Sequence, residues 1–171
     1  MAAATARRPV SERRGGMTPI ELRPLFTIKA EVTAPAQLVG AVPHGYTRRV
    51  MCVSGGRFEG ERLRGRVLPG GADVVLERPD GGLHLDVRLV LEAEGGGLVY
   101  MTYNGRRNGP TPEVMRKIVN REPIARGEDY FRVAVQFETA APGLEWLNDR
   151  IAVGTGTRES DGPVYDVWEV A

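Results

Sequence analysis

The sequence contains few of the residues that build metal and redox sites. Its 171 residues include one cysteine, Cys52, and two histidines, His44 and His84. One cysteine cannot form an intramolecular disulfide, and a zinc site needs several histidine or cysteine ligands at characteristic spacing. We therefore expect no metal and a reducing compartment, the cytoplasm. A nucleophilic pair of Cys52 and His44 stays open, although a buried structural role is more common for a cysteine in an apolar run.

Nucleotide-binding motifs are also missing. The sequence has no Walker motif, and Gly154-Thr155-Gly156 lacks the later glycine of a dinucleotide fingerprint. We interpret this tripeptide as a turn and expect no cofactor.

Neither a charge excess nor a long apolar run is present. Lysine and arginine number 23 against 22 for aspartate and glutamate, so we expect no nucleic-acid partner. No apolar run approaches the roughly 20 residues that span a bilayer, so we expect no membrane partner. Arg7, Arg8, Arg13 and Arg14 stand near the beginning without the apolar stretch of a secretory signal. We interpret residues 1–18 as a disordered leader, with Met17 as an alternative start, and 19–171 as one domain.

What the sequence does contain is glycine, 22 residues of it, and apolar residues at a spacing of two. This pattern predicts an all-β fold with tight turns, a sandwich or a barrel. We predict strands over 22–32, 50–54, 130–139 and 164–170, and a hairpin of strands 83–92 and 98–104 around Gly95–Gly97. The strand over 50–54 is predicted to end at Gly55-Gly56, and Gly70-Gly71 and Gly81-Gly82 are predicted turns.

One segment departs from the alternation. Thr111 can cap a helix, Pro112 suits a first helical turn, and Val114, Met115, Ile118 and Val119 repeat at helical spacing before Pro123. This predicts one short helix in a long connection from Gly105 to Asp129. Such a connection is a lid or, more commonly, a plain packing helix.

Three ionisable residues are candidates for catalysis. Asp73 follows Gly70-Gly71-Ala72, where a carboxylate commonly accepts hydrogen bonds from turn amides. If Asp73 faces a cavity instead, burial would raise its pKa and let it move protons. Asp86 and Arg88 share one strand face, and the alternation favours a solvated ion pair on the outer face. The alternative is a polar cluster in a barrel mouth, where Arg88 would bind an oxyanion.

Several aromatic residues can stack on a flat ligand, although aromatic side chains in strands more often pack in the core. They are Tyr100, Tyr103, Tyr130, Phe137 and Trp146. The basic pairs Arg48-Arg49 and Arg106-Arg107 are predicted to be exposed.

Together, a series of short motifs resembles a known family. The motifs are Gly45-Tyr46-Thr47-Arg48-Arg49, Val53-Ser54-Gly55-Gly56, Phe58-Glu59-Gly60, Leu63-Arg64-Gly65, Leu68-Pro69-Gly70-Gly71-Ala72-Asp73, Asp80-Gly81, Leu85-Asp86-Val87-Arg88, Tyr130-Phe131-Arg132, Phe137-Glu138-Thr139, Trp146-Leu147-Asn148, Val153-Gly154 and Tyr165-Asp166-Val167. In this order they resemble the domain of unknown function 3237 family, from Glu21 to the C-terminus. One departure is Val74-Val75, where the family often has an aromatic and a polar residue, so the pocket near Asp73 is expected to be more apolar.

The resemblance implies a calycin-like antiparallel β-barrel with a central cavity, in many members a homodimer. Some fungal members are similar to cofactor-free cyclases that close an oxygen heterocycle in polyketide tailoring. The pocket candidates that the resemblance carries over are Asp73, Asp86, Arg88, Tyr130, Arg132, Glu138, Trp146 and Asn148.

From these observations we hypothesise a cofactor-independent acid–base enzyme on a small aromatic or polyketide-like molecule. The chemistry would be cyclisation, isomerisation or intramolecular hydroxyl addition. Asp73 or Asp86 would move the proton, and Arg88 would stabilise negative charge. Tyr103, Phe137 and Trp146 would hold the ring system. The alternatives are a non-catalytic small-molecule carrier with the same cavity and a structural subunit of a larger assembly.

Overall fold

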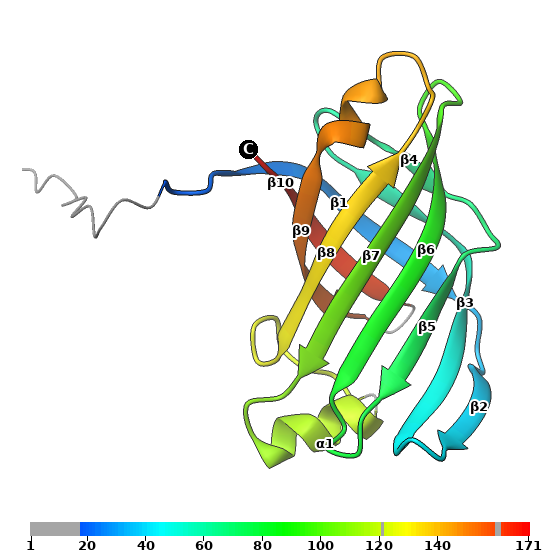
Figure 1. Cartoon of the computed structure of the whole chain (residues 1–171), viewed down its shortest axis with the longest axis vertical. Coiled ribbons are helices and arrows are strands. Elements are labelled where there is room, and N and C mark those ends of the chain that lie inside the picture. The colour runs from blue at the N-terminus through cyan, green and yellow to red at the C-terminus, as the bar shows by residue number, and fades with distance from the viewer. Residues whose placement is uncertain (1–17, 121, 160–161) are drawn as a thin grey trace, which may run out of the picture.

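The computed structural model describes residues 18–120, 122–159 and 162–171, which form ten strands, one α-helix and one 3-10 helix (Figure 1). The predicted leader, 1–18, lies outside the described residues except for Thr18. The strands and helices are β1 Leu22–Val32, β2 Gln37–Val42, β3 Tyr46–Glu59, β4 Gly65–Val67, β5 Ala72–Glu77, β6 Leu83–Ala93, β7 Leu98–Asn108, α1 Pro112–Asn120, β8 Tyr130–Glu138, η1 Glu145–Asp149, β9 Ile151–Arg158 and β10 Pro163–Val170.

The strands close into an antiparallel barrel, which confirms the predicted fold class. Hydrogen-bonded neighbours run in the order β1-β10-β9-β8-β7-β6-β4-β3, and β3 pairs again with β1 to close eight strands into a ring. Two further strands extend the wall toward one end. β5 pairs with β3 and β6, as β4 does, and β2 continues along β3 beyond the end of β1.

The predicted alternation decides which side chains fill the barrel. Leu85, Val87, Leu89 and Leu91 of β6 point inward and are buried, and Phe131, Val133, Val135 and Phe137 of β8 do the same. In β1 the predicted inward face holds from Phe26 onward. A register shift between Pro24 and Phe26 leaves Leu22 exposed and buries Leu25 beside Phe26.

Three predicted strand limits were wrong, each at a glycine. The strand predicted to end at Gly55-Gly56 continues to Glu59, and a side chain at Gly56 would meet the Lys29 carbonyl oxygen of β1 at 2.2 Å. Gly154-Thr155-Gly156 lies within β9 rather than in a turn. β7 runs through Gly105 to Asn108, so the long connection begins later than predicted. These glycines permit close packing of strands and rings instead of ending strands.

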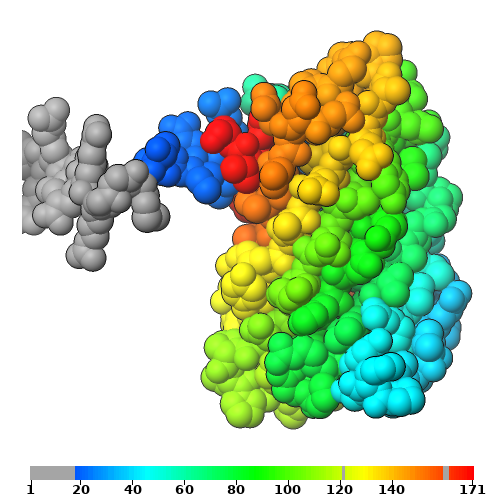
Figure 2. Space-filling view, in the orientation of Figure 1, coloured from blue at the N-terminus to red at the C-terminus, as the bar shows by residue number. Residues whose placement is uncertain are grey.

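The two ends of the barrel are built differently. η1, drawn in orange, lies over one end, and its Leu147 is fully buried in the core. α1 lies at the opposite end (Figure 1). Side chains of β6, β7 and β8 cover the wall between these ends on the face shown in Figure 2. In the described part of the chain, neither helix has the length and apolar character needed to cross a bilayer.

Candidate functional site

A cavity occupies the α1 end of the barrel. Its volume is about 90 Å³. A single buried water needs about 10–15 Å³, so the cavity holds several waters or one small ring compound. Most of its wall is apolar, contributed by valine, leucine and other inward-facing residues of the strands. The polar lining consists of six side chains: Asp73, Arg49, Arg107, Arg158, Tyr103 and Tyr165.

Asp73 reaches the cavity from β5. Its Oδ1 accepts a hydrogen bond from the backbone N–H of Asp86 at 3.2 Å. Burial raises the pKa of Asp73 to about 7, and the hydrogen bond and the charge of Arg49 oppose that rise only in part. Val75, two residues further along β5, lines the same cavity, and most of the other lining residues are apolar. Near neutral pH this carboxyl group is present in both protonation states and can act as an acid or a base.

Two phenols stand beside this carboxyl group. Tyr103 of β7 and Tyr165 of β10 share a hydrogen bond, and their ring centroids lie 5.2 Å apart. Burial raises the pKa of both hydroxyls well above the ordinary tyrosine value, and the charge of Asp73 raises it further. Both phenols are therefore neutral at pH 7 and act as hydrogen-bond donors or acceptors.

Three guanidinium groups complete the polar lining. Arg107 is buried and its Nε donates to Asp129 Oδ2 at 2.6 Å, while its Cζ lies 5.0 Å from the centroid of the Phe131 ring. Arg49 on β3 is ion-paired with Glu77. The charges of Arg107 and Arg158 both act on the Tyr165 hydroxyl and partly oppose its raised pKa. The cavity therefore combines one carboxyl group near its midpoint of titration with fixed positive charge.

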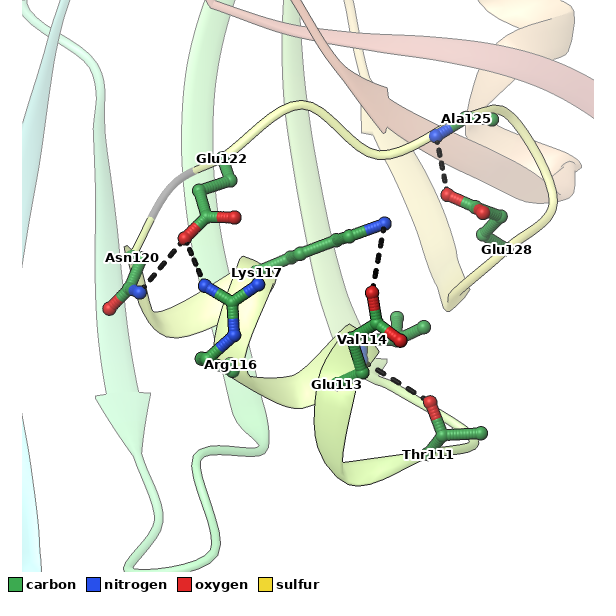
Figure 3. A network of polar contacts seen from close by, with 9 residues as sticks. All are labelled: Thr111, Glu113, Val114, Arg116, Lys117, Asn120, Glu122, Ala125 and Glu128. Atoms are coloured by element: carbon green, nitrogen blue, oxygen red, sulfur yellow. Dashed lines mark hydrogen bonds and ion pairs between the residues drawn. The ribbon is translucent and has the colours of Figure 1, made fainter.

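The α1 segment closes over this end through one buried side chain, Ile118, which lines the cavity. Its drawn polar contacts are local, as Figure 3 shows. The Val114 N–H donates to the Thr111 Oγ1 at 3.3 Å, which confirms the predicted cap. Arg116 and Asn120 both donate to Glu122. Because these contacts join the segment to itself, α1 rests on the cavity chiefly through apolar contact.

Of the residues predicted for the site, the structure brings Asp73 and Tyr103 together at the cavity. It places Asp86 and Arg88 on the outer face, where Arg88 Nη1 lies 2.6 Å from Asp86 Oδ1 and both side chains are largely exposed. The solvated outer ion pair that the alternation favoured is therefore what the structure shows, and the catalytic roles hypothesised for Asp86 and Arg88 do not fit this position outside the cavity.

The other predicted site residues also lie away from the cavity. Tyr100, Tyr130, Arg132 and Glu138 are on the outer faces of β7 and β8. Phe137 is buried near the η1 end and packs against Phe26, with ring centroids 6.1 Å apart. Trp146 stacks under the Arg62 guanidinium at 4.1 Å, and Asn148 bonds the backbone of Thr139. These contacts give Phe137, Trp146 and Asn148 structural roles.

Sequence reasoning missed Arg49, Arg107, Arg158 and Tyr165. The predicted exposure of the basic pairs holds for Arg106 alone, since Arg49 and Arg107 line the cavity. Arg48 is half-buried, and its Nη1 donates to the Val74 carbonyl oxygen at 2.9 Å. The sequence did contain a signal for Arg107: it lies four residues after Tyr103 in the same strand, so both side chains point to the same face. Among the described residues, no three histidine, cysteine, aspartate or glutamate side chains gather as a metal centre would require.

Known proteins share this sequence and barrel. The family described as Protein of unknown function (DUF3237) matches residues 20–170. The UPF0311 protein RPA1785 of Rhodopseudomonas palustris is 36% identical over 155 residues, which cover 90% of this chain and 99% of the relative.

Solved structures show the same architecture. A beta-barrel like protein from Acinetobacter baumannii superposes with a TM-score of 0.80 at 32% identity, covering 92% of this chain and 100% of the other. A structure described as an enzyme from Penicillium herquei has a TM-score of 0.67 at 21% identity, covering 92% and 99%. The second likeness shows the fold alone.

Proposed function

The chain belongs to the DUF3237 family, and on that premise we propose that its barrel is a cofactor-independent acid–base enzyme acting on a small aromatic or polyketide-like molecule. The reaction would be cyclisation, isomerisation or intramolecular hydroxyl addition in natural-product tailoring. The observation that supports this most directly is the Asp73 carboxyl group in an apolar cavity beside two phenols and three guanidinium groups. The Penicillium herquei neighbour is described as an enzyme, which is consistent with chemistry in this fold.

The proposed roles follow from protonation state. The pKa of Asp73, about 7, lets its carboxylate take a proton from carbon or oxygen and its acid form return one. In an isomerisation, the carboxylate removes a proton next to a carbonyl group and then protonates a second carbon. In a hydroxyl addition, the acid protonates an alkene carbon, the hydroxyl oxygen bonds the adjacent carbon, and the carboxylate takes the hydroxyl proton. Both reactions leave the enzyme unchanged.

Negative charge on the reacting oxygen needs a cation. The cavity arginines, rather than the outward-facing Arg88, are the groups that can supply it. Tyr103 and Tyr165 can donate to the same oxygen or fix the orientation of the ring.

A panel of substrates in deuterated water tests this proposal. Purified protein is incubated with enolisable aryl ketones and alkenyl phenols, and NMR follows deuterium incorporation and ring closure. We expect turnover of at least one class and a loss of about 100-fold or more in Asp73→Asn. The exposed Asp80→Asn is the matched control and should keep the wild-type rate. Equal rates in wild type and Asp73→Asn would contradict the proposed role.

A second candidate, a small-molecule carrier, is favoured by the apolar wall of the cavity. A carrier would bind members of the same panel and convert none of them. Its affinity would also survive Asp73→Asn, because removing a proton-transfer group costs little binding energy.

We also propose that the barrel acts as a homodimer in the cytoplasm, without nucleic-acid or membrane partners. The family resemblance supports the dimer, and the net charge of +1 supports the absence of a nucleic-acid partner. Light scattering on the purified chain would measure the dimer mass, and a monomeric mass would contradict this expectation.

A further inference from the structure

The cavity presents positive charge from three separate strands. Arg49 extends from β3, Arg107 from β7 and Arg158 from β9, and all three line the same space. Arg107 and Arg158 are both close enough to Tyr165 for their charges to act on its hydroxyl. Arginines that converge in this way on an otherwise apolar wall form a binding surface for an anion.

Carboxylates outside the cavity hold two of these arginines in place. Asp129 binds Arg107 through Nε, and Glu77 binds Arg49 through one Nη nitrogen. Neither Asp129 nor Glu77 lines the cavity. A guanidinium group carries five N–H donors, so one such bond fixes its position and leaves donors for a ligand. Arg107 and Arg49 are therefore pre-organised cations, and the carboxylates that bind them lie outside the cavity lining.

Asp73 is the one carboxyl group among the cavity-lining residues that the structure describes. It can be neutralised by a single proton, whereas the guanidinium groups remain charged. Among the lining side chains themselves, positive groups therefore outnumber negative ones, while the counter-charges Asp129 and Glu77 lie outside the lining.

We propose that the ligand of this cavity is a small aromatic or polyketide-like acid whose carboxylate is bound by Arg49, Arg107 and Arg158. This deepens the function proposed above and rests on it for the identity of the site. The apolar wall, with Phe131 and Leu85, would hold the carbon skeleton. The carboxylate would be at the guanidinium groups, where planar N–H pairs match its two oxygens.

The test uses benzoate and its neutral isostere benzamide, which match the cavity in size and differ in charge. Titration calorimetry at about pH 6, where benzoate is ionised and Asp73 is mostly protonated, compares their affinities. We expect benzoate to bind at least about tenfold more tightly, the size of one or two charge-assisted hydrogen bonds.

Two variants and a control locate the effect. Arg158→Met and Arg49→Met should each reduce the preference for benzoate toward unity. Arg106→Met changes the exposed neighbour of Arg107 on the opposite face of β7 and should leave the preference intact. Circular dichroism melts establish that each variant is folded, and either cavity variant alone is sufficient for the comparison.

The proposal is overturned if benzamide binds as tightly as benzoate, or if neither binds at tens of millimolar. It is also overturned if both cavity variants keep the preference, because the anion would then bind elsewhere. None of these results depends on turnover. Failure here therefore leaves the Asp73→Asn rate comparison standing, and failure of that comparison leaves the ligand class standing.

Discussion

The barrel holds an inward-pointing carboxylate near each end, and the two have different partners. At the η1 end, Glu169 of β10 is buried and ion-paired with both Arg62 and Arg150, the latter at 2.9 Å. At the α1 end, Asp73 accepts one backbone hydrogen bond and faces apolar side chains. Both lie in one continuous sheet, so the fold alone does not decide what a buried acid does.

The difference lies in the filling of space as well as in charge. η1 inserts Leu147 into the core at its end, and the Trp146 ring stacks on Arg62, which is ion-paired with Glu169. α1 contributes Ile118 and leaves a cavity below it. The η1 end is thus closely packed, and its buried carboxylate is paired with arginines. The α1 end contains a cavity and a carboxyl group that can titrate. A buried acid with a perturbed pKa beside a cavity is the combination that indicates chemistry.

The largest expected effect comes from truncating the side chain that fills each end. Leu147→Ala should lower the free energy of unfolding by about 2–5 kcal/mol, because it leaves a void in a packed core. Ile118→Ala should cost about 2 kcal/mol, the lower end of the same range, because part of its surface already faces a cavity. Urea denaturation measures both. Equal losses would show that the α1 end is packed as tightly as the η1 end.

The pH dependence of stability isolates the acid at the α1 end. The pKa of Asp73 is about 7 in the folded protein and about 3.9 when unfolded, so the folded state holds more protons between these values. Stability should therefore fall by about 2–4 kcal/mol as pH rises from about 4 to 7. Burial is the main cause of this raised pKa. The backbone N–H of Asp86 and the charge of Arg49 lower it in part, and the Asp86 carboxylate raises it.

Asp73→Asn should remove this decline, and the exposed Asp80→Asn should keep it. Urea titrations of wild type and both variants over the same pH series give the difference directly. A wild-type profile in Asp73→Asn would mean that another group titrates.

A smaller effect is expected from the acid at the η1 end. Glu169→Gln should destabilise the protein by about 1–2 kcal/mol at pH 7, because two charge-assisted hydrogen bonds are weakened. Benzoate affinity should not change, since the cavity lies at the other end. The exposed pair of Arg66 and Glu92 provides the control, and Glu92→Gln should leave stability nearly unchanged. Weakened benzoate binding in Glu169→Gln would show that the two ends are coupled.

The smallest effect is expected in the α1 cap itself. Thr111→Ala removes the side-chain oxygen that caps α1 and should cost about 0.5–1 kcal/mol. Hydrogen exchange should speed up at the α1 amides and stay unchanged in η1, because α1 is tied mainly to its own segment. Uniform acceleration across the barrel would show that the cap does not open independently.

The strand alternation was sufficient to predict the barrel. In β6 and β8 the inward residues are apolar at every second position, so both register and face follow from period two. The limits of strands at glycines were harder to predict. Gly56 and Gly156 look like turn residues in sequence, but at each a side chain would collide with a neighbouring strand or with the Phe131 ring. That reason is visible only in three dimensions.

The site was predicted in part. Asp73 could be identified because a carboxylate follows a glycine turn and enters a strand, but its depth in the cavity could not. Arg107 was missed because the predicted strand ended at Asn104, four residues before the end of β7 at Asn108. Phe137 of β8 points inward as the alternation predicts, yet alternation does not say at which end of the barrel a residue lies. The position of a residue along the barrel axis follows only from the pairing of its strand with the neighbouring strands.

On each side of β3, two strands follow one another along the barrel wall, and this arrangement affects how the barrel can diversify. Between β3 and β6, the wall at the η1 end is β4 and the wall at the cavity end is β5, separated by the turn at Gly70-Gly71. β1 and β2 divide the other side of β3 in the same way. Substitutions in β5, which contributes Asp73 and Val75 to the cavity lining, can therefore reshape the cavity without changing β4 in the packed half. Evolution or protein design can therefore change ligand specificity in the cavity half, while the packed half continues to stabilise the fold.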